Sequence, residues 1–122
     1  VTPAETYLVA CYERWDTDLL ETRTRLFTTQ TLCVAHVAQL VLFYQTVLHE
    51  LAVHALVHND IKLENTLVGE VSGALILTDL DSLTLRTGAP SRGGTPLYMT
   101  PHRTGRAQRD LYAAYRCIVW FV

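Results

Sequence analysis

The segment from about Thr31 to Ala55 limits the possible folds more than any other part of the sequence. Its length and its apolar pattern predict one long helix. The polar side chains fall on a narrow stripe, and Leu, Val, Ala, Phe and Tyr occupy most of the other positions. A helix that is apolar around so much of its surface is expected to be buried on several sides. The polar stripe consists of His36, Gln39, Thr46, Glu50 and His54.

Composition excludes several classes of function. The segment is long enough for a membrane span, but polar side chains such as Gln39, His49 and Glu50 would be costly in lipid. The net charge of −2 gives no reason to expect nucleic-acid binding, which requires clustered cations. The three cysteines are far apart and odd in number, so neither a disulfide framework nor a zinc site is indicated.

Short apolar runs follow the long helix and predict strands, with the segment 69–73 as a hairpin turn between the last two. This arrangement places Asn65 and Asp79 at adjacent ends of paired strands. An amide and a carboxylate at such a position can converge on one Mg²⁺ ion, which prefers a few protein oxygens. The predicted strands are Leu56–Val57, Thr66–Val68 and Leu75–Leu77.

The two ends of the chain also show patterns. The run Thr6–Tyr12 is β-branched and aromatic and predicts a strand. A helix is expected to begin within the segment Glu13–Leu20, with Asp16 or Thr17 as its cap. The dense apolar segment from Asp110 to the C-terminal residue predicts a last helix.

The only lysine of the chain, Lys62, lies between Asp60 and Asn65. Phosphoryl transfer needs positioning and charge neutralisation more than covalent chemistry, so a carboxylate, an ammonium group and an amide at this spacing suit it. These three groups would hold the attacking hydroxyl, neutralise the phosphate and bind a metal ion. The alternative is a turn that closes a helix, because Asn and Asp are ordinary loop residues.

Four motifs together resemble those of the protein kinases and occur in the same order. The cluster around Lys62 resembles the kinase catalytic loop. The run Leu75–Asp81 resembles the strand and metal aspartate of the Asp-Phe-Gly motif, and Gly94–His102 resembles the end of an activation segment. Asp110 resembles the aspartate that begins the central helix. The position of Lys62 and the pair Gly94-Thr95 favour the serine/threonine branch.

This resemblance implies an α+β chain with a partial protein-kinase-like fold. It consists mainly of the helical large lobe, with short β-hairpins at the catalytic and metal-binding loops. Residues 1–30 would contain the end of the small lobe, the hinge and the following helix. Residues 31–122 would form part of the large lobe, truncated at the C-terminus. The missing small lobe and C-terminal helices of the same domain are then expected as partners.

The resemblance also implies roles for individual residues. Asp60 would accept or orient the proton of the substrate hydroxyl group, and Lys62 would steady the γ-phosphate. Thr95 would pack against both. Asn65 and Asp79 would hold Mg²⁺ or Mn²⁺ at the phosphates of ATP, and the other substrate would be a protein.

The adenine of ATP would contact Leu67 and the backbone from Cys11 to Glu13. Ala10 would control the depth of that pocket. His58 and Leu80 would belong to an apolar stack that ties the two loops to the central helix, and Asp110 would hold the catalytic loop from below.

Three positions depart from the family pattern. Asn59 replaces the arginine that in many kinases pairs with a phosphorylated activation segment. Asp81 replaces a glycine, and His102 replaces a glutamate that forms a buried ion pair. We therefore expect that any activation does not require phosphorylation of the segment after Asp81. These departures resemble those of the rhoptry kinases and pseudokinases of apicomplexan parasites.

Two functions follow from these observations. The first is ATP-dependent phosphoryl transfer to serine or threonine of protein substrates, as part of a larger kinase domain. The second is a pseudokinase or regulatory binding module without turnover, since the sequence contains no Gly-x-Gly-x-x-Gly loop. No signal peptide is visible, but Val1 is not an initiator methionine, so the compartment is open and a cytoplasmic location is only the default expectation. Secretion would follow if the rhoptry resemblance holds.

Overall fold

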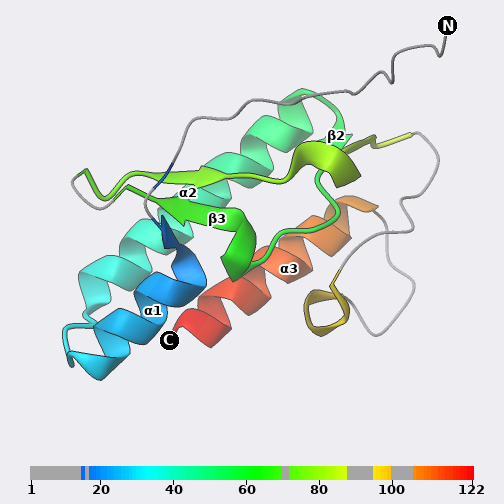
Figure 1. The fold of residues 1–122 in the computed structure, drawn as a ribbon. Coiled ribbons are helices and arrows are strands. Elements are labelled where there is room, and N and C mark those ends of the chain that lie inside the picture. The colour runs from blue at the N-terminus through cyan, green and yellow to red at the C-terminus, as the bar shows by residue number, and fades with distance from the viewer. Residues whose placement is uncertain (1–14, 16, 70–71, 88–94, 100–105) are drawn as a thin grey trace, which may run out of the picture.

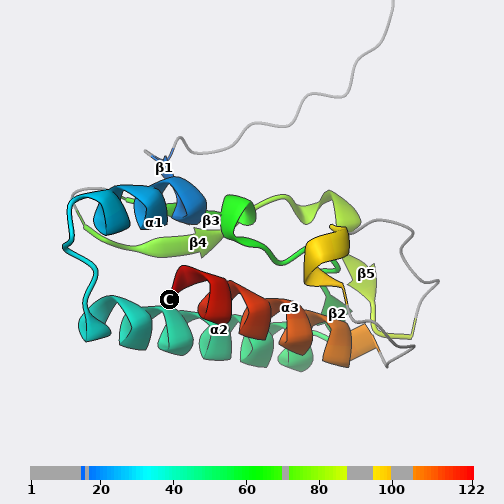
Figure 2. The ribbon, with the colours of Figure 1, turned by 90° about the horizontal axis from the view of Figure 1, so that it is seen from below.

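The computed structural model describes residues 15, 17–69, 72–87, 95–99 and 106–122. In these ranges the elements form two layers (Figures 1 and 2). Helix α2 (Val34–Val53) and helix α3 (Arg106–Phe121) lie side by side in one layer. Helix α1 (Leu19–Thr28) and the sheet that contains Thr66–Val68 and Leu75–Leu77 make up the other layer. The α+β class expected from the sequence is confirmed.

The described strands form two small antiparallel sheets. One contains β1 (Thr17–Asp18), β3 (Thr66–Val68) and β4 (Leu75–Leu77), in the order β1-β3-β4. The other pairs β2 (Leu56–Val57) with β5 (Thr84–Leu85). The sequence predicted β2, β3 and β4. It did not predict β1 and β5, because Thr17–Asp18 and Thr84–Leu85 are not apolar runs like the three that were predicted.

The hairpin of β3 and β4 has the expected turn between them. Thr66 is paired with Leu77, and Val68 is paired with Leu75. The backbone N–H of Gly73 donates to the carbonyl oxygen of Gly69 at 2.7 Å. Gly73 has a φ of 68°, a left-handed conformation that glycine adopts without steric cost.

Helix α2 is the long helix that the sequence predicted, although it begins at Val34 and ends at Val53. The expectation that it is buried on several sides is wrong for the described residues. Only Leu40 and Tyr44 are buried, whereas Val34 is 84% exposed and Leu42 is 64% exposed. The reason is that α3 and the hairpin layer cover one side of the helix, and no other described element packs on its outer face.

The starts of the other two helices differ from the prediction. Asp18 caps α1, because its Oδ1 accepts a hydrogen bond from the Glu21 backbone N–H at 2.8 Å. Thr17 lies in β1 instead, and Asp16 lies outside the described residues. Helix α3 begins at Arg106, ahead of Asp110, so the polar residues before Asp110 belong to the same helix.

The core lies where the two layers meet. It contains Leu40 and Tyr44 of α2, Cys117 and Phe121 of α3, and Ile61 of the intervening loop. A large apolar side chain that is fully buried stabilises the fold by about 1.5–3 kcal/mol. Burial also raises the pKa of the Tyr44 phenol, which therefore stays protonated and shares a 2.7 Å hydrogen bond with a threonine of β3.

The remaining predictions about the fold concern the N-terminal strand, the boundary near residue 30 and a possible membrane span. The predicted strand Thr6–Tyr12 lies outside the described residues, as do Ala10, Cys11 and Glu13. The expected division near residue 30 falls in the loop between α1 and α2. No helix in the described ranges is long and apolar enough to cross a lipid bilayer.

Candidate functional site

The loop after β2 is held in place by a buried carboxylate on α3. Asp110 is 3% exposed, and its two oxygens accept hydrogen bonds from the backbone N–H groups of His58 at 2.7 Å and Asn59 at 2.9 Å. Burial raises the pKa of the Asp110 carboxyl group, while these two bonds and the nearby His58 and Arg109 act in the opposite direction. The predicted position of Asp110 beneath the loop is therefore what the structure contains.

Asp60, Lys62 and Thr95 converge at the end of this loop. The Thr95 hydroxyl donates to Oδ1 of Asp60 at 2.8 Å and accepts from Nζ of Lys62 at 2.9 Å. The Lys62 ammonium group lies 3.7 Å from Oδ2 of Asp60. The two charged side chains are 21% and 14% exposed, so the group is partly shielded from water yet reachable. An acceptor for a hydroxyl proton thus lies beside a cation.

Asn65 and Asp79 lie at adjacent strand ends, as the sequence predicted. Asn65 directly precedes β3, and its carbonyl oxygen accepts the Thr78 backbone N–H at 2.8 Å. The Asn65 side-chain nitrogen donates to the Asp60 carbonyl oxygen at 2.9 Å, which leaves the amide oxygen as its metal-binding atom. Asp79 follows β4 closely and has φ 61° and ψ 71°.

The donor set at these strand ends fits a hard divalent cation. An amide oxygen from Asn65 and a carboxylate from Asp79 are oxygen ligands of the type that Mg²⁺ prefers, and Mg²⁺ usually keeps further positions for water and phosphate. The described residues contain no group of three or more His, Cys, Asp or Glu side chains arranged as a metal site. The two-residue set therefore suits a cation that a phosphate helps to bind.

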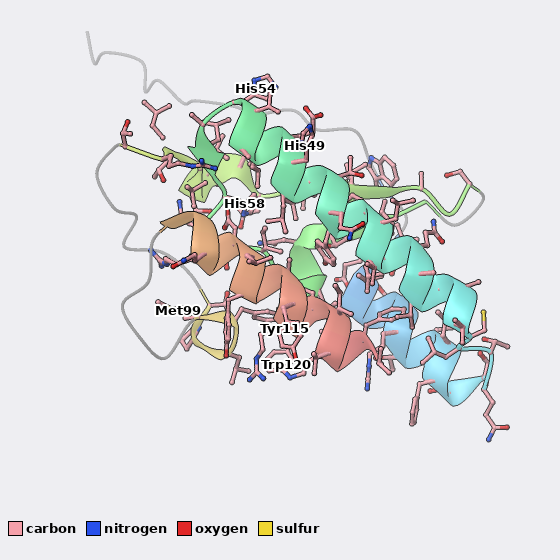
Figure 3. The ribbon with its side chains drawn as sticks, turned by 180° about the vertical axis from the view of Figure 1, so that it is seen from behind. His49, His54, His58, Met99, Tyr115 and Trp120 are labelled. Carbon is pink, nitrogen blue, oxygen red and sulfur yellow. The ribbon has the colours of Figure 1, made fainter. Side chains whose placement is uncertain are left out.

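His58 connects the loop that contains Asp60 to the strand end that contains Asp79. Its Nδ1 accepts the Asp60 backbone N–H at 3.1 Å, so the neutral ring carries its proton on Nε2. Nε2 then donates to the Thr78 carbonyl oxygen at 3.0 Å. Figure 3 shows His58 in the interior, whereas His49 and His54 lie on the outer side of α2.

Leu80 departs from its expected role. The side chain is 50% exposed, so it does not belong to a buried apolar stack in the described structure. It lies in the 3₁₀ turn Leu80–Ser82, on a part of the surface that no other described element covers. His58, the other expected member of the stack, is fully buried.

Asn59 has a role that the sequence did not indicate. Its side-chain nitrogen donates to the carbonyl oxygen of Ser82 at 2.7 Å and to the Thr84 hydroxyl at 2.9 Å. It also lies 3.2 Å from the Val57 carbonyl oxygen. The sequence presented Asn59 only as the loss of an arginine charge. Ser82 and Thr84 carried no signal, because one carbonyl oxygen and one hydroxyl group that accept a side-chain hydrogen bond have no characteristic spacing in a sequence.

Leu67 is the one predicted adenine contact in the described ranges. It lies in the middle of β3, is half-buried, and is paired with Asp18 of β1 and Ile76 of β4. The other predicted contacts, Ala10, Cys11 and Glu13, lie outside the described residues. The structure therefore places one element of the predicted nucleotide site next to the predicted metal ligands.

A groove of about 560 Å³ begins at Thr95 and runs between α1 and the end of α3. Its wall includes Tyr98 and Trp120, whose rings meet edge to face with centroids 4.7 Å apart. The Tyr98 hydroxyl donates to Oε1 of Glu64 at 3.3 Å, and burial raises the pKa of that phenol. Trp120 is labelled in Figure 3, at the C-terminal end of α3. The groove is open to solvent and lined mainly by apolar side chains.

Comparison with known proteins gives matches among solved structures. The chain is similar to the kinase PK-1 of Cydia pomonella granulovirus, with 25% sequence identity and a TM-score of 0.71 over 87% of this chain and 41% of the other. It is also similar to the ROP18 kinase domain in complex with AMP-PNP and sucrose, with 22% identity and a TM-score of 0.69 over 88% of this chain and 32% of the other. The chain thus spans less than half of the length of either structure. No protein-family model and no curated protein matches the sequence.

Proposed function

The chain has a partial protein-kinase fold, and on this premise we propose that it is the large-lobe part of an enzyme that transfers the γ-phosphoryl group of ATP to serine or threonine of a protein. The fold expected from the resemblance is confirmed, and the expected likeness to rhoptry kinases is consistent with the match to the ROP18 kinase domain. The phosphoryl transfer, the protein substrate and the divalent cation are what we propose here.

The contact of Asp60, Thr95 and Lys62 is the observation that carries the proposal. A substrate hydroxyl that displaces the Thr95 hydroxyl from Oδ1 of Asp60 would be held by a carboxylate able to orient and accept its proton. The Lys62 ammonium group, within 3.7 Å of the same carboxylate, would lie close enough to neutralise the transferring phosphoryl group.

Asn65 and Asp79 would hold Mg²⁺ or Mn²⁺ through the amide oxygen and the carboxylate. When bound, the cation supplies charge neutralisation at the nucleotide phosphates. The chain's own contribution is to fix the two ligands: the Asn65 amide is oriented by the Asp60 carbonyl oxygen, and the strand ends are joined by the bond from Thr78 N–H to Asn65. The ROP18 kinase domain was solved with AMP-PNP, an ATP analogue, which supports ATP as the phosphoryl donor here.

The groove that begins at Thr95 is the proposed place for the protein substrate. Thr95, whose hydroxyl contacts Asp60, is among its lining residues, so a peptide bound in it would pass close to that carboxylate. The small lobe and further helices of the same domain would complete the enzyme around this part.

The second candidate is a pseudokinase or regulatory binding module. Asp79 is followed by Leu80 and Asp81 in a 3₁₀ turn, where the family pattern has a residue that changes conformation freely. Loss of that freedom suits a module that does not change conformation during turnover. The intact set of Asp60, Lys62, Asn65 and Asp79 favours the enzyme.

The test measures transfer of labelled γ-phosphate from Mg²⁺-ATP to a generic basic protein by the full-length protein. We expect activity that Asp60→Asn lowers by about a hundredfold or more and that Glu50→Gln, an exposed change on α2, leaves unchanged. If wild type and Asp60→Asn are equally inactive while both bind Mg²⁺-ATP, the enzyme is excluded and the binding module is supported. If neither binds nucleotide, the proposed cofactor is wrong as well.

A further inference from the structure

Asp79 is held in a conformation that its own backbone disfavours. Its φ of 61° and ψ of 71° lie in the left-handed region, which aspartate and asparagine adopt more often than most residues with a side chain, but at a steric cost that glycine does not have. The contacts on either side of Asp79 therefore decide whether its carboxylate stays at the proposed metal site.

The contacts before Asp79 come from the catalytic loop and from the hairpin. His58 donates from Nε2 to the Thr78 carbonyl oxygen at 3.0 Å, and the Thr78 N–H donates to the Asn65 carbonyl oxygen at 2.8 Å. The backbone carbonyl oxygen and the backbone N–H of Thr78 are thus both hydrogen-bonded. His58 is itself fully buried, so this side of Asp79 is attached to the core.

The contacts after Asp79 come mainly from Asn59. One side-chain nitrogen reaches both the Ser82 carbonyl oxygen at 2.7 Å and the Thr84 hydroxyl at 2.9 Å. The Ser82 hydroxyl donates a hydrogen bond to the His58 carbonyl oxygen at 2.7 Å. Asn59 is 8% exposed, so water competes little for these bonds.

The backbone conformation at position 59 also suits asparagine. Its φ is 75°, and asparagine is one of the few residues with a side chain that adopt positive φ readily. Its N–H is fixed by Oδ1 of Asp110 at 2.9 Å. The amide that holds the segment 82–84 is therefore anchored to α3 and carries no net charge.

We propose that Asn59 is a positioning residue that fixes the Asp79 loop, residues 79–84, in its metal-binding conformation without any phosphate group. Thr84 is part of this arrangement because its hydroxyl is the acceptor. A phosphate on the half-buried Thr84 would replace that acceptor with a bulky dianion at a buried amide. Phosphorylation of Thr84 therefore inhibits, and activity needs no phosphate on the loop. The effect on activity rests on the proposed kinase function, whereas the effect on the loop does not.

The test uses Asn59→Gly in the full-length protein. Glycine keeps the positive φ and removes only the amide. The matched control is Gln30→Gly, because Gln30 also has a positive φ, of 57°, and is exposed in the turn after α1. We expect Asn59→Gly to raise the Mg²⁺ concentration at half-maximal kcat by about tenfold, with little change in the KM for the protein substrate. Gln30→Gly leaves both unchanged.

Thr84→Val and Thr84→Glu are the second pair of variants, which keep the test informative if Asn59→Gly does not fold. We expect a smaller rise in the Mg²⁺ requirement for Thr84→Val than for Asn59→Gly, and a strong loss of activity for Thr84→Glu. Phosphatase treatment of the wild type is expected to leave its activity within about twofold. Loss of activity on that treatment, or a normal Mg²⁺ requirement in a folded Asn59→Gly protein, overturns the proposal.

Hydrogen exchange separates this proposal from the proposed kinase function. We expect the amides of residues 80–84 to exchange at least about tenfold faster in Asn59→Gly than in wild type and in Gln30→Gly. If no protein transfers phosphate but this difference is present, the kinase function fails and the positioning role stands. If the exchange rates are equal, the positioning role is wrong whatever the activity.

Discussion

Thr95 is the residue that bridges the two charges of the site. Its hydroxyl lies between Lys62 and Asp60, with bonds of 2.9 Å and 2.8 Å, while the charged groups themselves are 3.7 Å apart. At 3.7 Å the ammonium group and Oδ2 already form an ion pair, and the threonine hydroxyl bridges the ammonium group to Oδ1. A closer contact would occupy the carboxylate oxygen that the substrate hydroxyl needs.

Thr95→Val tests this arrangement in the full-length protein. Valine has the same shape and lacks the hydroxyl, so Lys62 is expected to close on Asp60 and lower kcat by about tenfold to a hundredfold. Thr95→Ser keeps the hydroxyl and should retain most of the activity. Equal kcat values for the valine variant and the wild type in steady-state assays would contradict this role.

The buried carboxyl group of Asp110 gives stability a pH dependence with a definite sign. Burial raises its pKa in the folded state above its value in the unfolded chain. Its contribution to stability is then full below about pH 4, the unfolded pKa, and is lost as the pH rises through the folded pKa. Asp110→Asn cannot titrate. We expect the free energy of unfolding of the wild type, relative to that of the variant, to fall between pH 4 and pH 7.

Urea denaturation of both proteins at the two pH values measures this difference. All other titrating groups are shared by the two proteins and cancel in the comparison. A relative stability that rises with pH would show that the two backbone N–H bonds, rather than burial, dominate the pKa of Asp110.

At the residue scale the sequence predicted the close neighbours of the site better than the distant ones. Asp60, Lys62 and Asn65 belong to one short run, so any tight loop brings them together. Thr95 is distant in sequence and was found only through the resemblance to kinases. The partners of Asn59 were missed, because a side-chain amide that bonds to a backbone carbonyl oxygen leaves no pattern in the residues it contacts.

At the element scale the apolar patterns predicted which helices and strands form, and their ends were less certain. The period of α2 is evident from many residues, whereas its burial depends on which elements lie against it. The start of α1 was misplaced for a different reason. Several adjacent residues could cap it, and the pairing of Thr17 with Val68 in the sheet leaves Asp18 as the cap.

Asp18→Ala measures the value of that cap. The change removes the acceptor for the Glu21 backbone N–H, so we expect a loss of about 1 kcal/mol in the free energy of unfolding. Asp18→Asn is the control, because asparagine caps helices about as well as aspartate. Thermal or urea unfolding of the three proteins distinguishes them. An equal loss in both variants would assign the effect to charge rather than to the cap.

At the scale of the whole molecule, the described chain leaves large apolar side chains exposed on both helices of one layer. They include Val34, Leu42 and Val53 on α2 and Leu111 and Val119 on α3. The matched kinase structures are more than twice as long as this chain, so they contain further elements that could cover such faces. The sequence could not show this exposure, because a pattern of apolar residues indicates which faces seek burial but not what covers them.

The 122-residue chain by itself is therefore expected to self-associate. Sedimentation velocity between about 1 and 100 µM should show a weight-average mass that rises with concentration. Leu42→Glu combined with Leu111→Glu should lower that association and leave the free energy of unfolding nearly unchanged, since both side chains are exposed. A monomer at all concentrations would contradict this expectation.

The pairing of β1 with β3 has a mechanical consequence. Thr17 and Asp18 are hydrogen-bonded to the strand that begins directly after Asn65, and Asp18 also caps α1. Tension applied to the chain ahead of Thr17 is therefore transmitted to β3 across a ladder of only two residue pairs before it reaches the helix. Because Thr17 is paired with Val68, a member of the buried core, and Asp18 with Leu67, a pull from that end would load these two pairs first and reach Asn65 only through β3.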